Sequence, residues 1–173
     1  MRRRNRERGG STLVEFTLVG IPIIFVLIST FEMARGMWIY HSLAYSVKEA
    51  TRYASVHGAS CSTSPNSCTV TIGNIATVLK NSGPALIPGQ TTVTFKDSSG
   101  ATTTGLLSTL LTNSTAWPPS SPAGTNAIGQ SVTITAKYPF RSIISMFWPG
   151  TGAAIGPLGL VWFPAQSTDR IQF

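Results

Sequence analysis

Side chains that could perform acid–base or metal chemistry are scarce in this sequence. Its 173 residues include six acidic side chains and two histidines, His41 and His57. The two histidines fall on roughly opposite phases of a predicted long helix, so each is better explained as an exposed or interfacial helix residue than as a catalytic base. No nucleophile, phosphate-binding or metal-spaced motif occurs. The sequence therefore indicates no catalytic residue, no cofactor and no metal site.

Clusters of basic side chains are absent after residue 8. The formal net charge is +7, but residues 1–10 contribute +4 of it and leave +3 for the rest of the chain. Cations that are spread in this way do not form the basic stripe expected of a nucleic-acid-binding surface. The concentrated charge belongs to five arginines that precede an apolar run: Arg2, Arg3, Arg4, Arg6 and Arg8.

Cysteine is limited to Cys61 and Cys68, in the segment CSTSPNSC. The even count, the short spacing and the polar loop favour a local disulfide on an extracytoplasmic side, with two free thiols as the alternative. A zinc site would need more ligands than this segment offers, since His57 is the only other candidate nearby.

What the sequence does contain is one long apolar run near its start. Residues 10–31 read GSTLVEFTLVGIPIIFVLISTF, and no charge occurs between Phe16 and Phe31. About 20 apolar residues that rise 1.5 Å each cross a hydrocarbon core of about 30 Å, so we predict a transmembrane helix over residues 11–31. Five arginines precede it, whereas the charges of Glu32 and Arg35, which follow it, cancel each other. The positive-inside rule then places residues 1–10 in the cytoplasm. Pro22, inside the run, is expected to kink the helix.

Glu15 is the only ionisable side chain in residues 11–31, and it closely follows Gly9 and Gly10. A carboxylate at the centre of a membrane helix costs about 2.5–3.5 kcal/mol, less near an end, and such residues usually have a function. If the chain were cut after Gly10, Ser11 would gain a free ammonium and Glu15 would become the fifth residue. Its carboxylate could then pair with that amine, with the positive end of the helix dipole, or with the amine of a neighbouring subunit.

This pattern of a basic leader, a small residue, a glutamate and an apolar helix resembles the class III signal of type IV pilins and pseudopilins. The stretch from Gly10 through Glu15 to Phe16 is similar to that of the tight-adherence (Tad/Flp) branch, and the chain length is similar to the TadE-like pseudopilins. The segments TRYASVHG, VTITAKYPF and STDRIQF also resemble segments of TadE-like proteins, although Ser55 departs from the family's "YAR" ending.

The resemblance implies a structural minor pilin or pseudopilin of the bacterial inner membrane rather than an enzyme. It implies processing between Gly10 and Ser11 by a prepilin peptidase, and a role for Glu15 and Phe16 in assembly and register. The implied partners are that peptidase, Flp pilins and other pseudopilins, in a hetero-oligomeric pilus or secretion apparatus that serves adhesion, biofilm formation or secretion.

Two other interpretations of the apolar run remain open. A secretory signal peptide would have a shorter apolar region and a small-residue cleavage site after it. An uncut signal anchor would instead make the chain a bitopic envelope protein with an extracytoplasmic binding domain. Retention of the leader arginines in the mature protein would favour this second alternative.

After the span, residues 32–58 are predicted to continue the helix as an amphipathic segment that ends at Gly58. Apolar residues recur at spacings of three or four and define one face that covers a globular domain. The residues of this predicted face are Ala34, Met37 or Trp38, Leu43 or Ala44, Val47, Ala50 or Thr51, and Ala54.

Residues 59–173 are predicted to form an extracytoplasmic β-rich domain. We expect strands over residues 67–72, 91–96, 131–138 and 156–163, with Pro139 ending the third of them. A short helix is expected over residues 72–80, a turn or helix over 140–148, a surface excursion over 101–130 and a tail over 166–173. The predicted fold is therefore α+β and pilin-like, with one long N-terminal helix packed on a small antiparallel sheet.

Overall fold

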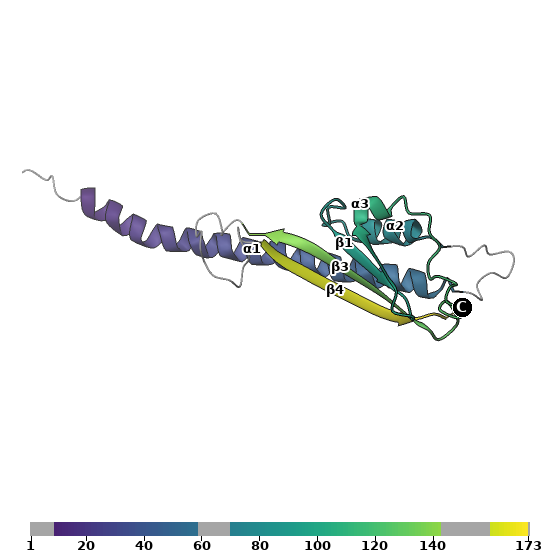
Figure 1. Ribbon diagram of the computed structural model, residues 1–173. Helices are drawn as coiled ribbons and strands as arrows, with labels where there is room; N and C mark the ends of the chain where they lie inside the picture. The colour runs from purple at the N-terminus through teal and green to yellow at the C-terminus, as the bar shows by residue number, and fades with distance from the viewer. Residues whose placement is uncertain (1–8, 59–69, 143–159, 173) are drawn as a thin grey trace, which may run out of the picture.

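A 47-residue helix, α1 (Gly9–Ser55), is the longest element of the chain (Figure 1). The computed structural model describes residues 9–58, 70–142 and 160–172. The predicted spanning and amphipathic segments form one uninterrupted helix, which ends at Ser55, three residues before the expected stop at Gly58. Pro22 lies inside α1, and the helix continues through it.

Among the described residues, four strands form an antiparallel sheet in the order β2-β1-β3-β4. The strands are β1 (Thr92–Lys96), β2 (Thr102–Leu106), β3 (Ser131–Arg141) and β4 (Leu160–Arg170). This arrangement confirms the predicted α+β class, with a long helix followed by a small antiparallel sheet.

One face of the sheet packs on the C-terminal half of α1, and α2 (Ile72–Ser82) packs on α1 as well. The strand β3 presents Val132, Ile134 and Ala136 to this core, as its alternation predicts. The predicted helix over residues 72–80 is confirmed in α2. Thr71 caps the start of α2 by accepting a hydrogen bond from the Asn74 backbone N–H at 3.2 Å.

Hydrogen bonds join the C-terminal end of α1 to the end of β4 and the residue after it. The Ser55 hydroxyl donates to the Asp169 carboxylate at 3.0 Å, and the Gln172 backbone N–H donates to the Ser55 carbonyl at 2.8 Å. The prediction of a tail over residues 166–173 is wrong for Gln166 to Arg170, because these residues complete β4. The expected strand over residues 156–163 begins, within the described residues, at Leu160 and continues to Arg170.

Pro139 does not end β3, contrary to the prediction. Proline lacks the N–H that a central strand needs. However, β1 begins at Thr92, opposite Lys137, so no described strand pairs with β3 on that side at Pro139. On its other side, Pro139 remains paired with Trp162 of β4. The start of the predicted segment over residues 140–148 thus belongs to β3, and residues 143–148 lie outside the described part of the chain.

Residues 101–130 are not simply a surface excursion. They contain the edge strand β2 and the short helix α3 (Leu107–Leu110), and they contribute Leu107, Leu110 and Trp117 to the core. The Trp117 ring meets Phe95 edge-on at 5.2 Å between centroids. The predicted strand over residues 67–72 is wrong at its described end, where Thr71 forms a single bridge and α2 begins at Ile72.

Candidate membrane and assembly surface

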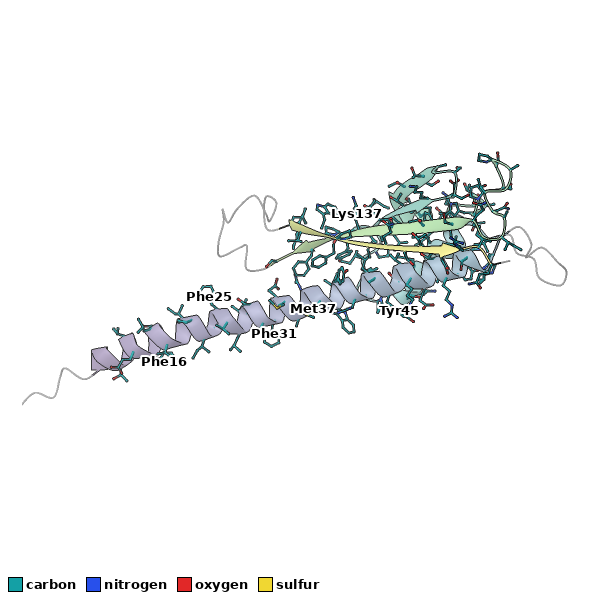
Figure 2. The ribbon with its side chains drawn as sticks, turned by 90° about the horizontal axis from the view of Figure 1, so that it is seen from below. Phe16, Phe25, Phe31, Met37, Tyr45 and Lys137 are labelled. Atoms are coloured by element: carbon teal, nitrogen blue, oxygen red, sulfur yellow. The ribbon has the colours of Figure 1, made fainter. Side chains whose placement is uncertain are left out.

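The N-terminal half of α1 extends beyond the domain and packs on none of its strands (Figure 2). Its large apolar side chains are exposed, Phe16 by 77%. Apolar surface of this extent is typical of contact with lipid or with another protein. The exposed apolar residues are Leu13, Val14, Phe16, Leu18, Val19, Ile21, Ile23, Ile24, Phe25, Val26, Leu27 and Phe31.

By length and composition, α1 is long and apolar enough to cross a membrane, and it is the one such helix among the described residues. Its hydroxyl groups suit that environment, because Thr17, Ser29 and Thr30 each donate to a backbone carbonyl three or four residues earlier. Polar groups in a hydrocarbon core need such internal partners. The segment therefore presents a largely apolar surface from residue 16 to residue 31.

The residues singled out for processing and assembly lie at the start of α1. Gly10 and Ser11 belong to its first turn. Glu15 lies about one and a half turns after Gly10, and both Glu15 and Phe16 are exposed. Cys61 and Cys68, the predicted disulfide, lie outside the described residues.

The face of α1 that packs on the domain begins at Glu32, before the predicted start at Ala34. Near this start, it also lies on a different side of the helix from the predicted apolar face. Glu32 and Gly36 are buried, whereas Ala34, Met37 and Trp38 are exposed. That part of the predicted face is therefore wrong. Further along, the prediction holds, because Leu43, Val47, Ala50, Thr51 and Ala54 are fully buried.

The cause of this difference is the hairpin of β3 and β4, which extends along α1 to Gly36. A Cβ atom on Gly36 would lie 3.6 Å from Phe140 Cζ and 3.7 Å from Phe163 Cζ. The Phe140 and Phe163 rings stack on each other with centroids 5.1 Å apart. Gly36 thus faces the two aromatic rings at a distance that would also accommodate a methyl group.

Arg35 ties the helix to the same hairpin. Its guanidinium carbon lies 4.7 Å from the centroid of the Phe140 ring, and its Nη2 donates a hydrogen bond to the Arg141 carbonyl. A carboxylate oxygen of Glu32, which is 8% exposed, lies 3.7 Å from that nitrogen. The first two charged residues after the apolar segment therefore take part in docking the domain. The sequence alone indicates only that their charges cancel.

The two histidines lie apart: His41 is on α1, whereas His57 follows the end of α1 by two residues. His41 is exposed, and its ring meets Tyr40 edge-on at 6.0 Å between centroids. His57 Nδ1 lies 2.6 Å from the Tyr53 carbonyl oxygen. In the described ranges, no three His, Cys, Asp or Glu side chains gather where they could hold a metal ion.

A shallow groove of about 620 Å³ runs beside the unpaired end of β3. Arg35 and Ile39 of α1 form one wall, and Gln90 and Leu106 lie on another. Among the described residues that line it, the ionisable side chains are those of Arg35, Arg141 and Tyr138. These described side chains do not include the general acid and general base that would suggest a catalytic centre.

Comparison with known families gives a match that covers most of α1. Residues 10–52 match the TadE-like protein family. The match confirms the TadE-like resemblance over this segment, which includes both the exposed half of α1 and most of its buried half. TadE-like proteins are structural pilus components, associated with a membrane, rather than enzymes. No curated protein and no solved structure matches the chain.

Proposed function

We propose that this chain is a minor pilin or pseudopilin of a Tad pilus-like secretion system. The observation that carries the proposal is the division of α1 into an exposed apolar half and a half that forms the core of a domain. The TadE-like match runs across the border between the two halves. A single helix of this kind can anchor its domain in the inner membrane and later pack beside the same helix of other subunits.

We further propose that a prepilin peptidase removes residues 1–10. Five arginines would hold the leader in the cytoplasm, and Gly10 would offer the small residue at the cut. Catalysis would belong to the peptidase, and this chain would be its substrate. The C-terminal domain would then lie in the periplasm or at the cell surface.

Assembly would use the exposed half of α1, through contacts with Flp pilins and other pseudopilins. Its apolar side chains would pack between helices, with Phe16 near the start of the interface. The Glu15 carboxylate would pair with the free amine of Ser11 in a neighbouring subunit and so set the register between helices. A charge-assisted contact of about 1.5–3 kcal/mol would favour the correct register by about 10- to 100-fold.

The proposal is tested by Glu15→Ala, with Glu49→Ala as a matched control on the half of α1 beyond the apolar segment. Both variants should enter the membrane fraction as the wild type does. Glu15→Ala should co-purify with Flp pilin and pseudopilins about tenfold less, whereas Glu49→Ala should not change the yield. Equal assembly of the wild type and Glu15→Ala would refute the role given to this carboxylate.

A further inference from the structure

The end of the β3–β4 hairpin at Arg141 and Leu160 lies at the level of α1 where a membrane surface is expected. Residues 12–31 span about 30 Å of helix, which matches a hydrocarbon core. Arg35 follows about 6 Å beyond Phe31. The polar layer on each side of the core is about 5–8 Å thick, so Arg35 and the strand ends that contact it fall within or beside that layer.

The position of the hairpin along the helix is fixed by specific contacts. Arg35 binds the Arg141 carbonyl and lies over the Phe140 ring, and Phe140 and Phe163 close on Gly36. Figure 2 shows the ends of both strands beside the stretch of α1 that carries Met37. The side chains at this end of the hairpin are therefore held at a defined height above the apolar segment.

The exposed side chains at this end suit a lipid headgroup layer. Arg141 pairs with Leu160, and Pro139 pairs with Trp162, so Arg141 and Trp162 are diagonal neighbours on the face of the hairpin that points away from α1. Arg141 is exposed, and Trp162 is 52% exposed. Tryptophan is enriched at membrane interfaces, and arginine binds phosphate groups through two parallel hydrogen bonds.

The local charge is complementary to phosphate. Among the described residues at this end, Glu32 carries the one carboxylate. It is almost fully buried and is paired with Arg35. Arg35 keeps 43% of its side chain exposed. The exposed charge at this end is therefore positive.

We propose that this end of the hairpin rests on the surface of the bilayer that α1 spans. Arg141 binds the phosphate groups of the lipids, and Trp162 lies in the interfacial layer. The inference rests on the proposed function in one respect, because it requires that α1 cross a membrane. It adds a second, reversible attachment, which fixes the tilt of the domain and which must be released when a subunit leaves the membrane for a fibre.

The test uses full-length protein in vesicles of phosphatidylcholine and phosphatidylglycerol, with Trp162 as the single fluorophore. Trp38, Trp117 and Trp148 are replaced by phenylalanine. A second protein carries these changes together with Trp162→Phe and Phe25→Trp, which places the fluorophore in the apolar segment. Each is quenched in turn by lipids with a nitroxide on the headgroup or on the middle of the acyl chain.

We expect the headgroup label to quench Trp162 more strongly, and the acyl-chain label to quench the protein with Phe25→Trp more strongly. Quenching of the second protein without quenching of Trp162 would overturn the inference and leave the proposed function intact. Absence of quenching in both would contradict the membrane span itself, and with it the proposed function.

A charge reversal tests the phosphate contact separately. Arg141→Glu should lower the ratio of docked to undocked hairpin, measured by headgroup quenching of Trp162, by about fivefold or more. Arg170→Glu makes the same change at the far end of β4 and should leave the quenching unchanged. Equal quenching in the two variants would show that Arg141 does not bind the lipid. Near-UV circular dichroism confirms that both variants fold.

Discussion

Replacing Leu43 by alanine tests whether the two halves of α1 have different roles. Leu43 is 0% exposed in the core cluster. Leu43→Ala removes three carbon atoms, or about 2.4 kcal/mol of transfer free energy at about 0.8 kcal/mol for each. The cavity left behind raises the expected loss of unfolding free energy to about 3–5 kcal/mol. This is a large share of the 5–15 kcal/mol, roughly, that stabilises a typical domain.

The matched change is Leu27→Ala, on the exposed half of the same helix. Leu27 is 53% exposed, so its truncation should change the unfolding free energy of the domain by no more than about 0.5 kcal/mol. Both full-length variants are unfolded with guanidinium in detergent micelles, and near-UV circular dichroism follows the packing of the Phe95 and Trp117 rings. Equal losses of stability would refute the division of α1 into a core half and an exposed half.

Three further substitutions test local contacts in the same unfolding assay. Gly73→Ala should cost about 1–3 kcal/mol, because its Cβ would lie 2.8 Å from the Leu111 carbonyl oxygen. Gly36→Ala should be tolerated and could add up to about 1 kcal/mol through helix propensity, because the nearest contact of its Cβ is an ordinary 3.6 Å. Asp169→Ala should cost about 1 kcal/mol, since the buried Ser55 hydroxyl keeps a second acceptor in the helix. An unchanged midpoint for Gly73→Ala, or a lowered one for Gly36→Ala, would contradict the packing described for that glycine.

The buried faces of the helices can be predicted from the sequence where apolar residues recur at the helical period and the same residues are buried. In α2, Ile75, Ala76 and Leu79 lie on one face and enter the core, as their spacing indicates. In α1 the same reasoning succeeds from Leu43 onward and fails near Met37. There, the contact surface is set by the reach of a hairpin more than 100 residues away in the chain, which no local pattern reports.

The segment over residues 101–130 shows another limit of the sequence pattern. The edge strand β2 contains three threonines and Gly105, and its burial does not alternate. The helix α3 has four residues, too few to display a helical period. No local pattern therefore indicates that Leu107 and Leu110 are buried in the core.

Pro139 illustrates how strand pairing can override a reliable local signal. Proline usually excludes a central strand. Here β3 is central only as far as Lys137 and becomes an edge beyond it, because β1 is shorter. The length of a neighbouring strand decides the outcome, and the sequence of β3 alone does not contain it.

The proposed processing is tested most directly at the N-terminus of the protein recovered from bacterial membranes, which is determined by intact mass and N-terminal sequencing. Comparison with and without reductant reports in the same experiment whether Cys61 and Cys68 form a disulfide. We expect a chain that begins at Ser11, so that Glu15 is its fifth residue. A chain that retains the leader arginines would contradict prepilin processing and would favour a bitopic envelope protein with an uncut anchor.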